Sequence, residues 1–373
     1  MTKARELADL IANVNNGSSL ANKNLIINGG MTVALRSSSA VAVSDGSNEG
    51  YQTVDRFRFD FGNNAGGAAN ISQDTDVPSG YGFTNSYKVD VTTADTSIDS
   101  THMISIGHRV EAQDIASCGW THTSSSSYMT LSFWAKSVKA GTYCVSLNAS
   151  DSSSTRIFVK EYTLVANTWK KVEITFSGES GVTVNNDNGM GLNIQWTLVA
   201  GSSRNNATNN TWNSSDTSIG TSNQVNFFDD VANNFFLTGV MLEVGEKASP
   251  HFEHEPFETT LSKCHRYFQR INPNPDNNSG GFMQMCSWNG SILYGTFIFP
   301  VEKRTPPDIA YSDLGHIRAY AANSHSDVTT FVSLGASTNR IEIKANNSSG
   351  STGDAAWLRI DDTSGYVDFD AEL

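Results

Sequence analysis

The part of the chain that decides the fold class is an eight-residue stretch, Met129-Thr130-Leu131-Ser132-Phe133-Trp134-Ala135-Lys136. Apolar residues take every second position in it, and threonine, serine, tryptophan and lysine stand between them. Successive side chains of a strand point to opposite faces, so the apolar set would line one face. The stretch therefore predicts a strand of an antiparallel sheet that has one buried and one solvent-facing side.

The same period-two pattern returns along the chain, between loops rich in serine, asparagine and glycine. It occurs at residues 57–59, 143–147, 172–176, 192–198 and 240–244. Trp196 is in phase with the apolar residues of its segment, so we expect it in the core. We also read residues 24–30 as an apolar strand segment that ends in turn residues. Many short alternating strands separated by turns are typical of a β-sandwich or jelly roll.

A second set of strand patterns follows the proline-bounded segment 250–256. A short helix is expected over residues 260–268, and Asn289-Gly290 suits a tight hairpin turn. The segments 292–299, 340–344 and 357–361 then read as strands. We therefore predict an all-β chain with two antiparallel β-sandwich (jelly-roll-like) domains behind a short N-terminal helix. The expected division is residues 1–20, 21–256 and 257–373.

The predicted N-terminal helix has one apolar stripe, formed by Leu7, Leu10, Ile11 and Val14. A helix this short is marginal in water by itself, so the stripe must pack against something. It could dock on another protein, bundle with the same helix of sister chains, or pack on its own body. We assign these four residues to anchoring or oligomerisation.

Composition excludes several classes of function. The chain has 373 residues, 17% charged residues and a formal net charge of −13, which disfavours nucleic acid as a partner. It has no apolar run of about 18 residues, so we expect no membrane insertion. Asp9 and Asn13 interrupt the place where a signal peptide would be apolar, so we expect no secretion by that route. The four cysteines lack metal-ligand spacing, and we read them as reduced thiols.

The order of the segments resembles a known group of proteins, the tail-fibre and related virion proteins of marine bacteriophages, cyanophages among them. The motifs that carry this resemblance are NLIINGGM at 24–31, VDRF at 54–57, LSFWAKS at 131–137, NTWKKV at 167–172, TGVMLEVG at 238–245, FEH at 252–254 and LSKCHRYF at 261–268. Residues 2–10 are also similar to the short leader of such proteins. Two departures are Met241 in place of an expected glutamine, and Tyr267-Phe268 in place of two tyrosines.

This resemblance implies a body like a carbohydrate-binding jelly roll and a homotrimer located in the virion, made in the cytoplasm of a bacterial host. It further implies an attachment to the phage tail or an adaptor protein through the N-terminus. The motifs look like framework strands, so the ligand would be set by the loops.

Aromatic residues in polar loops are the candidates for glycan binding, because sugar C–H faces stack on flat rings while short polar side chains bind hydroxyl groups. Trp120, Trp212 and Tyr81 stand in such loops, and packing within the loop is the alternative for each. Trp134 and Trp169 fall on the strand faces opposite the apolar sets. They are either exposed platforms or covered by a neighbouring domain or subunit.

Metal and catalytic patterns are weak. His251, Glu253 and His254 lack a second cluster that would complete a metal site, so we assign them to a surface or interface, with no catalytic and no metal residues. Calcium is possible at two carboxylate pairs, Asp74 with Asp76 and Asp95 with Asp99. We expect no other cofactor.

The sequence thus favours a non-enzymatic tail fibre or receptor-binding protein that recognises a host surface polysaccharide. The alternative is a capsid decoration or other structural appendage without receptor binding. A third hypothesis is a glycan depolymerase, which would need two carboxylates facing one groove.

Overall fold

The computed structural model describes residues 24–215, 217–273, 280–321, 324–346 and 351–373. The chain forms two compact units, one ending at Thr260 and the other comprising Leu261–Leu373. The predicted boundary lay four residues earlier, at 256/257. The predicted N-terminal helix, with Leu7, Leu10, Ile11 and Val14, lies outside the described residues.

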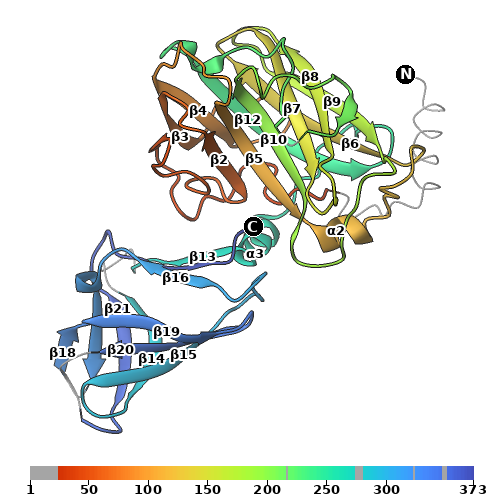
Figure 1. The fold of residues 1–373 in the computed structure, drawn as a ribbon. Helices are drawn as coiled ribbons and strands as arrows, with labels where there is room; N and C mark the ends of the chain where they lie inside the picture. The colour runs from red at the N-terminus through yellow and green to blue at the C-terminus, as the bar shows by residue number, and fades with distance from the viewer. Residues whose placement is uncertain (1–23, 216, 274–279, 322–323, 347–350) are drawn as a thin grey trace. The chain divides into compact units, whose positions relative to one another are not determined.

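The first unit consists of two six-stranded antiparallel sheets that lie as layers against each other (Figure 1). The first sheet has the order β1 (Val41–Ser44), β3 (Ala68–Asp74), β4 (Ser86–Thr93), β12 (Asn234–Val244), β6 (Tyr128–Ser137) and β9 (Lys170–Ser177). The second has the order β11 (Thr211–Asn213), β8 (Ile157–Leu164), β7 (Gly141–Ala149), β10 (Met190–Ala200), β5 (Met103–Glu111) and β2 (Phe57–Gly62). The helical elements are α2 (Ala112–Ser117), η1 (Phe227–Asp229) and α3 (Phe257–His265), the last of which crosses the boundary between the units.

The core of this unit lies between the two sheets, where the apolar faces of the alternating strands meet. Leu131 and Phe133 of β6 are fully buried, as the period-two pattern predicted. Trp196 of β10 comes from the opposite sheet and packs edge-on against Phe133, with 5.7 Å between ring centroids. Trp196 is fully buried, so its predicted place in the core is confirmed.

The segment 24–30 is not a strand, which corrects our expectation. Its residues form an irregular stretch and a turn alongside β12, where Leu25 donates its backbone N–H to the Leu242 carbonyl (3.0 Å) and Gly29 accepts from the Val240 N–H (3.0 Å). The side chain of Asn24 adds two further hydrogen bonds to β12. The Asn24 amide donates to the Val240 carbonyl (3.1 Å), and its oxygen accepts from the backbone N–H of Leu242 (3.0 Å). Gly29 then lies so close to Val240 that a Cβ would stand 2.1 Å from its carbonyl oxygen.

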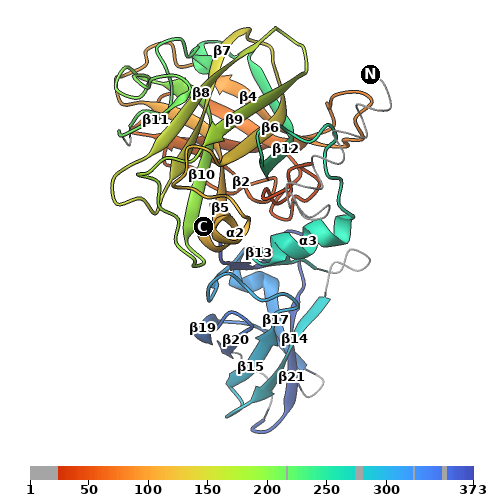
Figure 2. The same cartoon turned by 90° about the vertical axis from the view of Figure 1, so that its right-hand side faces the viewer.

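The second unit has a seven-stranded and a three-stranded antiparallel sheet (Figure 2). The larger sheet has the order β18 (Ser324–Asp327), β17 (Ile317–Ala321), β21 (Ala355–Ile360), β14 (Gly280–Ser287), β15 (Ile292–Ile298), β20 (Arg340–Asn346) and β19 (Thr330–Ala336). The smaller has the order β13 (Phe268–Ile271), β22 (Val367–Asp370) and β16 (Asp308–Tyr311), and a short helix, η2 (Leu314–His316), precedes β17.

One apolar cluster joins the two sheets of this unit, with Leu293 and Leu358 from the larger and Phe369 from the smaller. The helix predicted over 260–268 is observed three residues closer to the N-terminus, as α3, and Phe268 belongs to β13. Strands make up most of the regular secondary structure of the described residues, and the predicted all-β class is confirmed for them. No helix in the described part of the chain is both long and apolar enough to span a membrane.

Candidate functional site

A bulge in β12 creates the floor of the candidate site. The pairing of β12 with β6 shifts between Thr238 and Met241, and Gly239 has a φ of +63° there. A Cβ on Gly239 would lie 2.9 Å from the Trp134 ring and 2.6 Å from the Phe83 ring. Because glycine has no side chain and tolerates positive φ, both rings can lie directly over the backbone of β12.

The loop between β3 and β4 brings Tyr81 to this floor. Gly80 and Gly82 on either side of Tyr81 both have positive φ, which lets the loop turn tightly at its tip. The Tyr81 ring lies over Trp134, with 4.3 Å between ring centroids, and 53% of the Tyr81 residue is exposed. The loop is fastened at its end by Thr238, whose hydroxyl donates to the Asn85 carbonyl (2.7 Å).

The segment that follows β12 forms the other wall of the candidate site, opposite the Tyr81 loop. Buried Glu243 accepts a hydrogen bond from the Ser249 backbone N–H (2.9 Å) and another from the Ser249 hydroxyl. Lys171 of β9 donates to the Ser249 carbonyl (3.3 Å), so this chain segment is held from two strands. One ring nitrogen of His254 lies 2.9 Å from the Tyr81 carbonyl oxygen, which ties the segment to the loop that carries Tyr81.

These three parts enclose a hollow of about 150 Å³, which we call the aromatic hollow. It is lined by Gly80, Tyr81, Phe83, Ser132, Trp134, Lys171, Gly239, Met241, Ser249, Pro250, His251, Phe252 and His254. Aromatic rings dominate the lining, which also includes an ammonium, two imidazoles and three hydroxyl groups, those of Tyr81, Ser132 and Ser249. No aspartate or glutamate is among these described lining residues, so the hollow lacks the carboxylate pair of a glycoside hydrolase.

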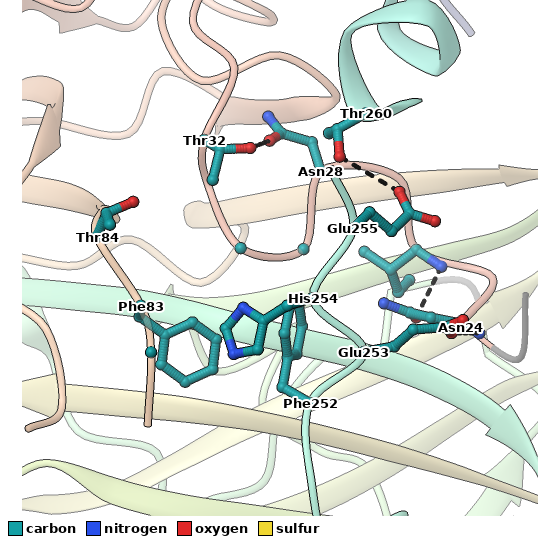
Figure 3. Close-up of a pocket in the computed structure, with 14 residues that line it drawn as sticks. Asn24, Asn28, Thr32, Phe83, Thr84, Phe252, Glu253, His254, Glu255 and Thr260 are labelled. Carbon is teal, nitrogen blue, oxygen red and sulfur yellow. Dashed lines mark hydrogen bonds between the residues drawn. The ribbon is translucent and has the colours of Figure 1, made fainter. Parts of the chain in front are cut away.

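A smaller crevice adjoins the hollow and shares its aromatic wall (Figure 3). Phe83, Phe252 and His254 form this wall, with ring centroids 4.9–5.2 Å apart. Two carboxylates line the crevice, but both hold the fold. Glu253 accepts from the backbone N–H of Asn24 (3.1 Å), and Glu255 accepts from the hydroxyl of Thr260 (3.3 Å).

Of the three aromatic residues predicted to bind glycan, only Tyr81 lines the hollow. Trp120 is 4% exposed, packs edge-on against Phe176 (5.7 Å) and donates its indole N–H to the Ser127 carbonyl (3.2 Å). Trp212 is half-buried, and its indole N–H donates to the Ser177 carbonyl (2.9 Å). For both tryptophans the structure favours packing within the unit, because a backbone carbonyl accepts from each indole N–H. The acceptor of Trp120 belongs to its own loop, whereas Trp212 lies in β11 and its acceptor is the end of β9.

The first carboxylate pair proposed for calcium is engaged by cations and an indole. Asp76 accepts hydrogen bonds from Lys136 and from the Trp169 indole N–H (3.0 Å), and Asp74 lies 3.7 Å from Lys88. Burial acts to raise the pKa of Asp76, but the hydrogen bonds and charges of these neighbours outweigh it and hold that pKa below its usual value. Trp169 is half-buried, and the ammonium group of Lys136, which pairs with Asp76, lies over its ring.

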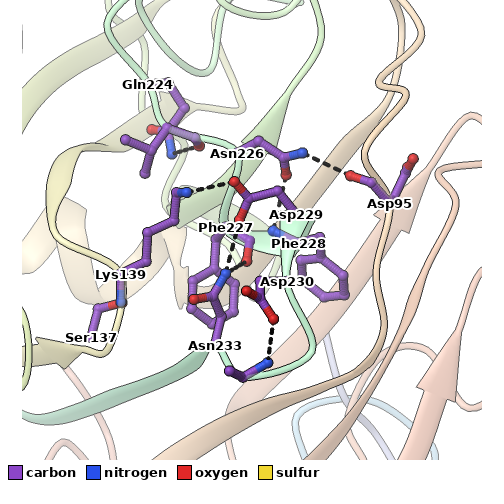
Figure 4. Close-up of polar contacts among 12 residues, drawn as sticks. Asp95, Ser137, Lys139, Gln224, Asn226, Phe227, Phe228, Asp229, Asp230 and Asn233 are labelled. Atoms are coloured by element: carbon purple, nitrogen blue, oxygen red, sulfur yellow. Dashed lines mark hydrogen bonds and ion pairs between the residues drawn. The ribbon is translucent and has the colours of Figure 1, made fainter.

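In the second pair, the imidazole of His102 lies between the carboxylates. Its ring nitrogens stand 3.6 Å from Asp95 and 3.5 Å from Asp99. Across the same loop, Asn226 donates to the Asp95 carbonyl (2.7 Å), and the nearby Asp229 is paired with Lys139 (2.6 Å), as Figure 4 shows. Within the described ranges, no three histidine, cysteine, aspartate or glutamate side chains converge as metal ligands.

Sequence reasoning placed Trp134 on the outer face of its strand but did not join it to Tyr81. The positive-φ pattern Gly80-Tyr81-Gly82 and the glycine within the apolar strand 238–245 were the available signals. A glycine inside a strand often marks a bulge or a close approach.

Comparisons with known proteins give similar structures but no family. No protein-family model matches the chain, and no curated protein matches it. The structure is similar to that of a protein from Bacteroides thetaiotaomicron described as sugar-binding (13% identity, TM-score 0.33). The match covers 60% of this chain and 100% of that one. The structure is also similar to a family 11 carbohydrate-binding module from Clostridium thermocellum, over 57% of this chain and 99% of that one (13% identity, TM-score 0.27). A cyclase from Fischerella sp. TAU matches over 60% and 98% (9% identity, TM-score 0.31).

Proposed function

We propose that the protein is a non-enzymatic virion appendage, a tail fibre or receptor-binding protein, and that its aromatic hollow binds a glycan on the host surface. The observation that carries the glycan-binding part is the Tyr81 ring over Trp134, 4.3 Å between centroids, in a hollow whose lining has no carboxylate. The part about the virion rests on the ordered sequence motifs.

The chemistry of the lining fits a sugar. The apolar C–H face of a pyranose gains free energy by stacking on an aromatic ring, while its hydroxyl groups need hydrogen-bond partners once they leave water. Tyr81 and Trp134 offer the rings, and Lys171, His251 and Ser249 stand around them as donors and acceptors. The hydrogen bonds from His254 and Thr238 hold the Tyr81 loop in place before a ligand arrives, which lowers the entropy cost of binding.

Attachment and assembly complete the proposal. The N-terminal stripe Leu7, Leu10, Ile11 and Val14 docks the protein on the phage tail or an adaptor and holds a homotrimer together. Three copies on one particle turn a weak single-site affinity into firm adsorption, because the second and third contacts form at a high effective concentration.

The experiment is adsorption of the labelled full-length protein to a panel of candidate host strains, with each strain's extracted surface polysaccharide as competitor. We expect binding to some strains, competed by their polysaccharide. Tyr81→Ala and Trp134→Ala should each lower the affinity about tenfold or more, the loss typical of a central aromatic contact. Trp134→Phe, which keeps a ring, should retain most of the binding.

The matched control is Val231→Ala, which changes a side chain as exposed as Tyr81 (55% against 53%) outside the hollow. Circular dichroism of each variant checks that it is folded. Binding that is unaffected by Tyr81→Ala and Trp134→Ala contradicts the site. Absence of binding to every strain that the parent particle infects favours the decoration role, and release of reducing ends from the polysaccharide favours a depolymerase.

A further inference from the structure

A row of aromatic rings crosses the larger sheet of the second unit, on the face turned away from the core. Tyr320 of β17 pairs directly with His325 of β18 on one side and with Trp357 of β21 on the other. Ala319, beside Tyr320, and Leu358, beside Trp357, are fully buried, so these two rings lie on the outer face, and His325 is exposed next to Tyr320. We call these three residues the ring row.

The rings of the row are nearly parallel. Tyr320 and His325 have ring centroids 5.1 Å apart with planes at 23°, and Tyr320 and Trp357 are 6.2 Å apart with planes at 14°. Trp357 is 51% exposed and His325 is also exposed. Large apolar groups this exposed on a folded chain usually mark an interaction surface when they are contiguous.

A charged network holds the row in position from beneath and beside it. The Tyr320 hydroxyl donates to Asp361 (2.6 Å), and the Arg359 guanidinium lies over the Tyr320 ring at 4.6 Å. Arg359 and Arg318 both lie within 4 Å of Asp361, and Arg318 also pairs with Asp327 (3.0 Å). Two arginines thus meet two aspartates, and the charges of the network cancel.

On the side of β14, Gly281 lies beside Trp357, and a Cβ on Gly281 would be 3.8 Å from the Trp357 ring, in ordinary contact. Gln284, which pairs with Trp357 across β14 and β21, is exposed and offers an amide. Among the described residues, the face next to Trp357 therefore combines ring surface, a neighbour without a side chain and an amide that both donates and accepts hydrogen bonds.

We propose that the ring row is a second glycan-binding surface, which takes an uncharged polysaccharide chain laid across the strands. Tyr320 is flanked by His325 and Trp357 and has Arg359 over its ring, so a sugar can stack on Trp357 at the end of the row. Neighbouring strands are about 4.8 Å apart, so further sugars of a chain laid across the strands can follow the edges of the other rings. The cancelled charges favour a neutral chain over an acidic one. The proposal shares its ligand class with the proposed function of the aromatic hollow, but it uses other residues and can fail separately.

The test is ¹⁹F NMR of the full-length protein labelled with 5-fluorotryptophan, which gives one signal for each of the seven tryptophans. Trp357→Phe and Trp134→Phe assign the two signals of interest. The probes are neutral hexasaccharides of glucose, xylose and mannose. We expect at least one of them to shift the Trp357 signal in a saturable manner, and Gly281→Val, which fills the space beside the ring, to weaken that response about tenfold or more.

Trp288→Ala is the matched control, because Trp288 belongs to the same unit and is 68% exposed but stands in the turn after β14. This variant should leave the Trp357 response unchanged. A shift of the Trp134 signal alone supports the hollow and overturns the ring row, and a shift of the Trp357 signal alone does the reverse.

If no hexasaccharide moves the Trp357 signal, the proposal is wrong. It is also wrong if the signal depends on protein concentration and size-exclusion chromatography shows an association that Trp357→Ala abolishes. In that case a second copy of the chain covers the row.

Discussion

The two units of the protein use tryptophan in opposite ways. All five tryptophans of the first unit are buried or half-buried, and the indole N–H groups of Trp120, Trp169 and Trp212 each have an acceptor. Both tryptophans of the second unit, Trp288 and Trp357, are more than half exposed. Four of the five indoles of the first unit therefore contribute to folding and only Trp134 lines the aromatic hollow, whereas both indoles of the second unit expose apolar surface that is available to a ligand.

The comparison predicts its largest effect at Trp196 in the core. Trp196→Ala leaves a cavity between the two sheets and should lower the free energy of unfolding by about 3–5 kcal/mol. Trp357→Ala removes an exposed ring and should change that free energy by about 0.5 kcal/mol or less. Urea unfolding followed by circular dichroism measures both. Equal losses for the two variants would remove the distinction between the units.

The next effect concerns the two tryptophans that we first assigned to glycan binding. Trp120→Ala should destabilise the protein by about 3 kcal/mol, and Trp212→Ala by less, because Trp212 is only half-buried. Glycan affinity of the folded fraction should stay within about twofold of the wild type, since neither ring lines the hollow. A binding titration below the unfolding midpoint checks this. A tenfold loss of affinity in a variant that is still folded would restore the original assignment.

The third prediction concerns a buried charge in the second unit and its effect on how stability depends on pH. Lys303 of the second unit is buried, and it donates to the His265 carbonyl (2.6 Å). Burial lowers its pKa to about 7, although Asp370 and Glu372 act in the opposite direction. Above pH 7 the folded chain holds fewer protons at this site than the unfolded chain, whose lysine pKa is about 10.4, so stability rises with pH.

This single group should add about 2 kcal/mol between pH 7 and pH 9, and Lys303→Met should remove that slope. Denaturant unfolding at both pH values, compared between wild type and variant, gives the result. Lys344→Met is the control, because Lys344 belongs to the same unit but is only half-buried, whereas Lys303 is 1% exposed. A slope that persists in Lys303→Met would assign the pH dependence to other groups.

The smallest effect is expected on the outer face of the first unit. The lowered pKa of Asp76 means that its contacts with Lys136 and Trp169 add stability above the usual carboxylate pKa and lose it as the pH falls. Asp76 is partly exposed, so Asp76→Asn should cost under about 1 kcal/mol at pH 7, and the cost should be smaller at pH 3, below the usual carboxylate pKa. Thermal unfolding at the two pH values measures it, and a larger cost at pH 3 would contradict the assigned pairing.

Local patterns were sufficient for the strands with clear alternation and for the direction of their side chains, but β3, β4 and β8 were not predicted. The alternation around Leu131 and Phe133 predicted which face is buried, and it correctly put Trp196 in the core. The same rule failed at residues 24–30, where two backbone hydrogen bonds and the Asn24 side chain hold an irregular segment against β12. The alternation of apolar residues does not reveal these contacts, because they depend on a strand more than 200 residues away in the sequence.

The candidate site was less accessible to sequence reasoning. Tyr81 was found because it stands in a glycine-rich loop, and Trp134 because it falls on the outer face. Their meeting depends on the bulge at Gly239, which belongs to a third segment. The burial of Trp120 depends likewise on the fold of its loop, since polar neighbours such as Ser127 contribute a backbone acceptor that a sequence pattern does not reveal.

The most direct test of the central claim is a calorimetric titration of the host's extracted surface polysaccharide into the full-length protein and into Trp134→Ala and Trp134→Phe. Binding through the aromatic hollow predicts saturable heat for the wild type, an affinity about tenfold or more lower for Trp134→Ala, and a value within about threefold of the wild type for Trp134→Phe. Equal affinities for the wild type and a folded Trp134→Ala would show that the glycan binds elsewhere on the chain.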